Sequence, residues 1–288
     1  MINELMNITS AKFKFIDACT SVRKTIQLLD KGFDFFVVTE DNSILGVLSA
    51  KELLKSHPNR IAADALKSEY EIVPSALTVW EAYEKLEQKP ETYLIVVDNG
   101  NNITGIADYS IIRFAISKYI DPLTGLFKSD FLYYQGIQSL KNHEEISVLF
   151  LDINEFGLIN KKYGHINGNI ILSEISSLLK QNTPPFSSWC RFGGDEFAMI
   201  ASMQLEESME LAQKIVESIS EHRFSIGVPI SVSIGIASGR RNKNQQLNNY
   251  IKIINNLINK ASLESTKAKK ALTCYLSSCG CLDINEIA

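Results

Sequence analysis

The chain has 288 residues, of which 45% are hydrophobic, and a formal net charge of −4. This length and composition allow one large or two ordinary domains with apolar cores, and they exclude a disordered tail. Charges of both signs are interspersed, which disfavours nucleic acid as a partner. The amino terminus has no basic segment followed by an apolar one, and no apolar stretch is long enough to span a bilayer, so we expect a cytoplasmic protein without a membrane partner. Five cysteines, an odd number, fit a reducing compartment.

The first 120 residues contain an internal repeat. FFVVTEDNSILGVLSAKELL (35–54) aligns with LIVVDNGNNITGIADYSIIR (94–113), and Gly46 and Gly105 are in register. Each copy predicts an apolar strand, a polar turn, a second strand that crosses the glycine, and an amphipathic helix, and a further helix precedes each copy. We expect the two copies to pack as one pseudo-symmetric domain.

This arrangement resembles a tandem pair of CBS domains over residues 1–116, with repeats of about 1–57 and 58–116. The resemblance implies a domain that senses an adenine nucleotide between its two copies. The alternative is a folding and dimerisation platform that binds no nucleotide.

In that family a Thr or Ser, followed three residues later by an Asp, holds the ribose hydroxyls. Ser49 and Glu52 occupy these two places in the first copy and are our candidates for a regulatory site, whereas the second copy has Asp108 and Ile111 there. Ser and Glu at the start of a helix are also ordinary capping residues, so a structural role is the alternative.

Beyond the repeat, apolar strands alternate with amphipathic helices. The stretch SIIRFAISKYI (110–120) predicts a helix that runs into DPLTGL without a flexible linker. The later pattern predicts an α/β (α+β) sandwich with helices on a sheet. Its expected elements are strands at 146–153 and 230–238, helices at 169–181 and 205–222, and a hairpin formed by SWCRF and EFAMIAS.

Acidic residues lie where two of these strands end. Asp152 ends the apolar run ISVLFLDI, and Asp195 and Glu196 follow Gly193 and Gly194 in the hairpin. Carboxylates from two neighbouring strand ends are suited to Mg²⁺, which prefers oxygen ligands. Glycines allow a tight turn and let a ligand approach the backbone. Turn chemistry alone selects the same residue types, so a purely structural role is the alternative for each residue taken singly.

Together these residues resemble the GGDEF family, the diguanylate cyclases, over residues 121 to about 275. The resemblance rests on DPLTGLF, LDINEF, INKKYGHINGN, RFGGDEF and SVSIGIA. It implies a palm-like nucleotidyl-cyclase domain, which we place at 117–288, after the CBS pair. It also implies a homodimer in which two GTP molecules are condensed into cyclic di-GMP with release of pyrophosphate.

The resemblance assigns roles to individual residues. Asp152, Asp195 and the backbone carbonyl of Ile153 would hold Mg²⁺ or Mn²⁺, and Glu196 would be a further ligand or would help to deprotonate the attacking hydroxyl. The acids Asp152, Asp195 and Glu196 are thus the catalytic candidates. The substrate-binding candidates are Gly193 and Gly194 beside the nucleotide, Phe156 and Gly157 at the β- and γ-phosphates, Asn160 and Asn169 at guanine, and Lys269 at a phosphate.

Several positions depart from the family around the substrate. The family's guanine-reading Asp is Asn169, and an amide both accepts and donates hydrogen bonds whereas a carboxylate only accepts them. Two cationic phosphate contacts are replaced by Gly157 and Thr273. The Arg and Asp that bind the product in many members are replaced by Pro184 and Ser187.

The sequence therefore predicts a diguanylate cyclase regulated by the CBS domain. Two alternatives follow from the departures. One is a catalytically impaired GGDEF domain that acts as a nucleotide-binding or partner-binding signalling module, and the other is a cyclase with relaxed base selectivity.

Overall fold

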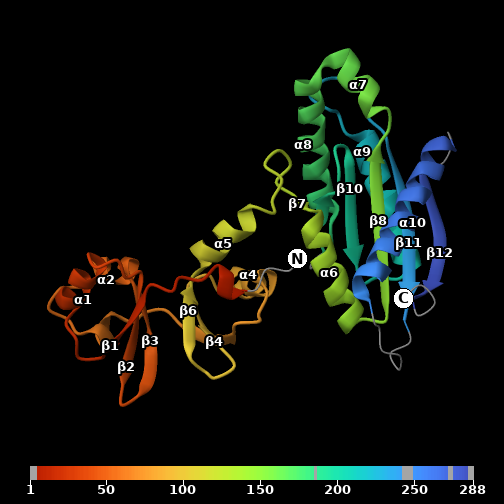
Figure 1. The fold of residues 1–288 in the computed structure, drawn as a ribbon. Coiled ribbons are helices and arrows are strands. Elements are labelled where there is room, and N and C mark those ends of the chain that lie inside the picture. The colour runs from red at the N-terminus through yellow and green to blue at the C-terminus, as the bar shows by residue number, and fades with distance from the viewer. Residues whose placement is uncertain (1–4, 185–186, 242–248, 272–274, 285–288) are drawn as a thin grey trace. The chain divides into compact units, whose positions relative to one another are not determined.

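The chain divides into two compact units, Met1–Lys118 and Tyr119–Ala288 (Figure 1). The predicted mixture of helices and strands is confirmed in both units. None of the helices in the described part of the chain is long and apolar enough to cross a membrane. The structure, a computed structural model, describes residues 5–184, 187–241, 249–271 and 275–284.

The first unit, Met1–Lys118, contains the same arrangement of elements twice. Its two sheets have the strand orders β1(Phe13–Asp17)-β2(Phe35–Glu40)-β3(Ser43–Ser49) and β4(Tyr70–Pro74)-β5(Tyr93–Val97)-β6(Ile103–Ala107). Its α-helices are α1(Val22–Leu29), α2(Ala50–Lys55), α3(Ala62–Ala65), α4(Val79–Gln88) and α5(Tyr109–Ser117). In each sheet the first strand is parallel to the second, and the second is antiparallel to the third. β1 and β4 are strands that the repeat did not predict.

The two sheets of this unit share an apolar core. The middle strands β2 and β5 contain the runs FFVV and YLIV, whose residues are all buried. Such continuous apolar runs are typical of strands that are covered on both faces. The buried residues of the shared core are Phe35, Val37, Val47, Tyr93, Ile95 and Ile106.

Each of the two glycines of the repeat makes room for a segment that belongs to the other copy. Residues 5–10 precede the first copy but pair with the second, through backbone hydrogen bonds and a β-bridge. A Cβ on Gly105 would lie 2.2 Å from Thr9 Oγ1 in this segment. The segment that leads into the second copy packs on the first in the same way, and a Cβ on Gly46 would lie 2.7 Å from Leu66 Cδ2. Each copy therefore covers the glycine strand of the other.

The second unit, Tyr119–Ala288, is built on one six-stranded sheet. The sheet has the strand order β12(Leu276–Asp283)-β11(Val232–Arg240)-β8(Glu145–Ile153)-β10(Glu196–Ala201)-β9(Trp189–Arg191)-β7(Phe127–Lys128). Its helices are α6(Ser129–Asn142), α7(Phe156–Tyr163), α8(His165–Asn182), α9(Leu205–Glu221) and α10(Tyr250–Lys270). α8 and α9 pack together on one face of the sheet, and α6 and α10 cover the other (Figure 1). β8, the most central long strand, has a buried apolar run because helices cover both of its faces.

Helix α10 packs directly on strand β11 at Gly235. A Cβ at this position would lie 2.0 Å from the carbonyl oxygen of Ala261 and 2.1 Å from the backbone nitrogen of Ser265. These are backbone atoms of α10, so neither can move away without displacing the helix. Gly235 thus sets the depth at which α10 lies against the sheet.

We expect Gly235→Ala to lower the free energy of unfolding by about 3 kcal/mol or more, at the upper end of the cost of overpacking a core. Urea unfolding followed by circular dichroism measures it. Gly157→Ala is the matched control, because a Cβ there has no atom within 4 Å and Ala is a better helix former than Gly. Equal stability of the two variants would contradict the close contact at Gly235.

Candidate functional site

Three acidic side chains lie at one end of the sheet in the second unit. Asp152, near the end of β8, is directly opposite Glu196, the first residue of β10, in an antiparallel register. Directly opposed residues project from the same face of a sheet, so these two side chains are neighbours. Asp195 precedes Glu196 and ends the turn that joins β9 to β10. The sheet register therefore gathers the three acids that the sequence selected.

The negative charges of these acids repel one another. Burial raises the pKa of Asp195, and the charge of Asp152 raises it further. Burial also raises the pKa of Glu196, with further contributions from Asp152 and Asp195. Carboxyl pKa values raised by burial and by neighbouring carboxylates are typical of functional sites. The cluster holds more negative charge than its surroundings compensate.

Lys269 on α10 contributes a positive charge to this cluster. Its Nζ donates a hydrogen bond to Asp152 Oδ1 and lies 3.4 Å from the carbonyl oxygen of Ile153. The close packing of α10 on β11 at Gly235 brings the lysine to the strand ends. As the side chains stand, with Asp152 paired to the ammonium, no three His, Cys, Asp or Glu side chains among the described residues are grouped to hold a metal ion.

The donor set nevertheless fits a hard divalent cation. The carboxylates of Asp152, Asp195 and Glu196 and the carbonyl of Ile153 offer oxygen atoms only, which suits Mg²⁺ or Mn²⁺. Burial, and then the neighbouring carboxylates, raise the pKa values of Asp195 and Glu196, and a bound cation would favour their ionised forms. A bound cation would compete with Lys269 for the carboxylate of Asp152.

The glycines of the turn leave space beside these acids. A Cβ on Gly193 would lie 2.5 Å from Glu196 Oε2, so this glycine lets the Glu196 carboxylate lie against the turn. A Cβ on Gly194 would have no atom within 4 Å, and Gly194 is exposed. The turn therefore presents open backbone on its outer side.

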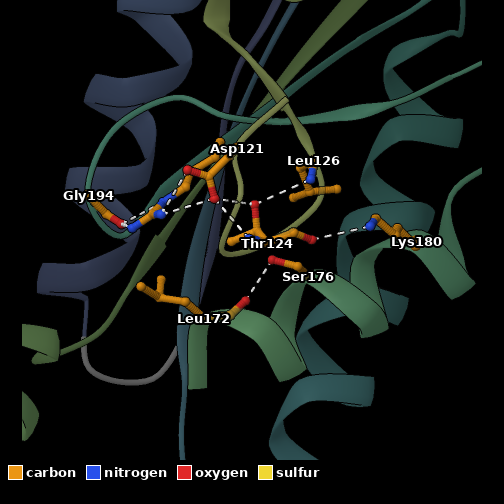
Figure 2. A network of polar contacts seen from close by, with 8 residues as sticks. Asp121, Thr124, Leu126, Leu172, Ser176, Lys180 and Gly194 are labelled. Atoms are coloured by element: carbon orange, nitrogen blue, oxygen red, sulfur yellow. Dashed lines mark hydrogen bonds and ion pairs between the residues drawn. The ribbon is translucent and has the colours of Figure 1, made fainter. Parts of the chain in front are cut away.

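A guanidinium group fixes the same turn from the other side. Arg191 donates hydrogen bonds from Nε and Nη2 to the carbonyl oxygen of Gly194, at 3.1 and 2.7 Å, and from Nη1 to the carboxylate of Asp121. Asp121 also accepts hydrogen bonds from the backbone and hydroxyl of Thr124, as Figure 2 shows. Burial alone would raise the pKa of Asp121, but Thr124 and Arg191 lower it below its usual value.

The sequence did not reveal this network. Asp121 and Arg191 are 70 residues apart, and the only signal was that each begins a quoted motif, DPLTGLF or RFGGDEF. The network joins the first turn of the unit to the acid-bearing hairpin.

The predicted guanine-binding residues lie on the helix pair α7 and α8. Asn160 is on α7, and its Oδ1 is buried without a hydrogen-bond partner among the described residues. A Cβ on Gly168 of α8 would lie 1.9 Å from this oxygen, so the two helices approach closely at that glycine. Asn169 is the next residue on α8 and is exposed. An unpaired buried acceptor suits a ligand that donates a hydrogen bond, as guanine does.

The start of α7 carries the predicted phosphate contacts. Phe156 is 9% exposed and packs in the core, while Gly157 is exposed and has no atom within 4 Å of a Cβ. Glu155 adopts a left-handed φ of 54° as the chain turns from β8 into this helix. Thr273, named above for a missing cation, lies outside the described residues.

In the first unit, Ser49 and Glu52 form a helix cap. Glu52 Oε2 accepts hydrogen bonds from the Ser49 backbone and hydroxyl, at 3.0 and 2.6 Å, and from the Tyr93 hydroxyl at 2.8 Å. Burial alone would raise the pKa of Glu52, but these hydrogen bonds lower it. Glu52 is only 6% exposed, so this carboxylate serves the protein itself in the structure. The contacts are those of a capping box.

A cavity of about 530 Å³ lies instead beside α5, between residues of the two copies. Its apolar lining includes Ile111 and Phe114, and its polar lining comes from Asn7, Thr9, Ser10, Asp34, Ser110 and Lys118. Ser10 donates a hydrogen bond of 2.7 Å to Asp34. The sequence pattern had favoured the first copy for a ligand, whereas this cavity lies beside the helix of the second copy, which lacks that pattern.

Comparison with known families shows the class of protein to which the chain belongs. Residues 118–268, just over half of the chain, match the family described as "Diguanylate cyclase, GGDEF domain", and residues 6–58 match the CBS domain family. The chain belongs to the GGDEF family and carries a CBS domain near its amino terminus.

Two curated relatives show the extent of the likeness. The chain is 32% identical over 136 residues to the bifunctional diguanylate cyclase/cyclic di-GMP phosphodiesterase MucR of Pseudomonas aeruginosa, covering 46% of this chain and 20% of the relative. It is 28% identical over 138 residues to the diguanylate cyclase DgcZ of Escherichia coli, covering 46% of this chain and 47% of the relative. The chain thus spans less than half the length of either relative.

Among solved structures, the GGDEF domain of DgcB from Caulobacter crescentus in complex with c-di-GMP matches with a TM-score of 0.47 and 22% identity. The match covers 56% of this chain and 95% of that one. The GGDEF domain of PA1120 from Pseudomonas aeruginosa matches with a TM-score of 0.45 and 25% identity, covering 54% of this chain and 97% of that one.

Proposed function

We propose that the chain is a diguanylate cyclase, which condenses two GTP molecules into cyclic di-GMP and releases pyrophosphate. The observation that carries the proposal is the set of three acids at the ends of β8 and β10, in a domain that matches the family; burial and neighbouring carboxylates raise the pKa values of Asp195 and Glu196. Reaction at the α-phosphate of GTP requires an attacking ribose 3′-hydroxyl and compensation of phosphate charge.

In this proposal the acids hold Mg²⁺ or Mn²⁺ together with the Ile153 carbonyl, and the ion, when bound, neutralises charge on the phosphates. Asp152 and Asp195 are the principal ligands, and Glu196 is a further ligand or accepts the proton of the hydroxyl. Lys269, released from Asp152, moves to a phosphate oxygen. Backbone N–H groups at the start of α7, around Phe156 and Gly157, cradle the outer phosphates.

The base lies between the α7 and α8 residues in this proposal. Guanine donates to the unpaired Oδ1 of Asn160 and meets the exposed amide of Asn169, and the open backbone of Gly193 and Gly194 borders the nucleotide. Because each domain binds one GTP and the attacking hydroxyl belongs to a second GTP, two copies of the chain must face each other as a homodimer.

Incubation of the purified chain with labelled GTP, with ATP, and with both, in Mg²⁺ or Mn²⁺, tests the proposal once the products are separated. We expect cyclic di-GMP from GTP. Absence of any dinucleotide from every mixture would contradict catalysis. GTP binding without turnover would then support the second candidate, an impaired domain used for signalling, which the absence of a cation at Gly157 favours.

The same assay tests base selectivity. Asn169 can donate as well as accept hydrogen bonds, so its amide can also pair with adenine. A mixed dinucleotide formed from GTP and ATP would support a cyclase with relaxed selectivity, and exclusive use of GTP would contradict it.

Lys269→Gln is expected to tighten Mn²⁺ binding in the absence of nucleotide, because the ammonium no longer competes with the metal ion at Asp152. The expected gain in affinity is only about threefold to tenfold, because the Lys269–Asp152 ion pair is partly exposed to solvent. Electron paramagnetic resonance of free Mn²⁺ measures the affinity. Lys267→Gln is the control, since this neighbouring lysine pairs with Glu264. Equal affinities of the two variants would exclude competition by Lys269.

We also propose that the first unit is a tandem CBS pair, over about 1–57 and 58–116, that regulates the cyclase. The repeated strand and helix order and the shared core support this proposal. The cavity beside α5 is where we place an adenine nucleotide. Calorimetric titration with AMP and ATP checks this, with Ser110→Val expected to weaken binding and Ser49→Val, in the capped half, expected to leave it unchanged.

A further inference from the structure

The second unit contains a cavity that the proposed reaction does not use. It has a volume of about 260 Å³ and lies between the turn at residues 125–127, the end of α8 and the start of β9. Leu126 and Phe127 contribute apolar walls, and Lys180, Ser187, Ser188 and Trp189 contribute polar groups. The acids at the ends of β8 and β10 do not line it. The cavity is therefore separate from the site described above.

Trp189, one of the residues that line this cavity, has an unsatisfied hydrogen-bond donor. Its side chain is 1% exposed, and its Nε1 has no hydrogen-bond partner among the described residues. A buried indole N–H normally finds an acceptor, because leaving the donor unpaired costs stability. The indole can only donate, so the missing group is an acceptor.

Lys180 brings a positive charge to the same cavity. Its Nζ donates to the carbonyl oxygen of Thr124 at 3.2 Å, as Figure 2 shows, and this bond uses one of the three ammonium hydrogens. A Cβ on Gly125 would lie 3.0 Å from this Nζ, so the glycine leaves room for the ammonium. No acidic side chain is among the described residues that line the cavity. The polar lining thus consists of an ammonium, an indole N–H and hydroxyl groups.

We propose that this cavity binds a small organic anion, a carboxylate or phosphate carried on an apolar group. The anion accepts hydrogen bonds from Trp189 Nε1 and Lys180 Nζ, and its apolar part lies against Leu126 and Phe127. The family's product is not the ligand in this proposal, since Pro184 and Ser187 replace the Arg and Asp that bind it. The proposal does not depend on cyclase activity.

Nuclear magnetic resonance of the indole groups tests the proposal on the full chain. The chain has two tryptophans, so its ¹H–¹⁵N spectrum has two indole signals, and Trp80, buried in the first unit, is an internal control. Titration uses benzoate, phenyl phosphate and uncharged benzyl alcohol as probes. We expect benzoate or phenyl phosphate, or both, to shift the Trp189 signal saturably and to leave the Trp80 signal in place. Their relative affinities distinguish a carboxylate from a phosphate site.

Two variants complete the test. Lys180→Gln is expected to weaken anion binding about tenfold or more, whereas Lys214→Gln, at an exposed position on α9, is expected to leave it unchanged. Trp80→Phe leaves one indole signal and assigns Trp189 without altering the cavity. A Trp189 signal that does not move, that moves equally with benzyl alcohol, or that responds alike in both lysine variants would overturn the proposal.

Discussion

Asp195→Asn is expected to abolish dinucleotide synthesis, with a loss of about a thousandfold or more, and at the same time to stabilise the metal-free protein. Activity falls because the amide cannot replace a carboxylate as a ligand that compensates metal charge. Stability rises because burial and the charge of Asp152 disfavour the ionised Asp195 in the folded state. Product analysis and urea unfolding without metal measure the two effects.

The pH dependence of the free energy of unfolding shows whether Asp195 stabilises or destabilises the folded state. The folded pKa of Asp195 lies above its ordinary value of 3.8, so the folded state binds the proton more tightly than the unfolded state. Its contribution to stability is therefore present below pH 3.8 and is lost as the pH rises through the raised pKa. The wild type should lose stability relative to Asp195→Asn across this range. Glu210→Gln, which removes an exposed acid on α9, is the control. A variant that is inactive but less stable than the wild type near neutral pH would contradict this account.

Restoring the missing cation by Gly157→Lys is expected to lower the KM for GTP about tenfold. Gly157 is exposed at the start of α7, and a Cβ there meets no atom within 4 Å, so the longer side chain can be added without a clash. A charge-assisted hydrogen bond to a phosphate accounts for a gain of this size. Steady-state kinetics of pyrophosphate release measure the KM.

Gly157→Gln is the matched control for this variant, since it adds a polar side chain of similar reach without the charge. If Gln lowers the KM as much as Lys, the effect is not electrostatic. If neither variant changes the KM, position 157 does not face the phosphates, and that part of the proposed site is wrong.

The elements with strong patterns were predictable from the sequence. The run ISVLFLDI is β8 almost to the residue, and the helix predicted at 205–222 is α9 at Leu205–Glu221. The proximity of Asp152 to Asp195 and Glu196 could also be predicted. A turn does not need two consecutive acids, and a metal site shared with Asp152 explains why they are there. The roles of these acids remain predictions, since they depend on ligands.

Contacts between distant residues were beyond the sequence. Glu52 looked like a ligand for ribose because its spacing from Ser49 fits one, but the same spacing makes a capping box, and only the fold brings Tyr93 to complete it. Lys269 was placed at a phosphate, and its pairing with Asp152 required knowledge of how deeply α10 lies on β11. β1 and β4 were missed because each is only five residues long and neither lies in the stretches that align in the repeat.

The exchange of segments at Gly46 and Gly105 has a consequence for how the first unit unfolds. A fragment that ended at residue 58 would keep residues 5–10 but lose the strand they pair with, and it would leave Gly46 uncovered. Neither half has a complete structure to retain when the other opens. The unit should therefore melt in a single cooperative transition, and the repeat is a unit of sequence duplication rather than a unit of folding.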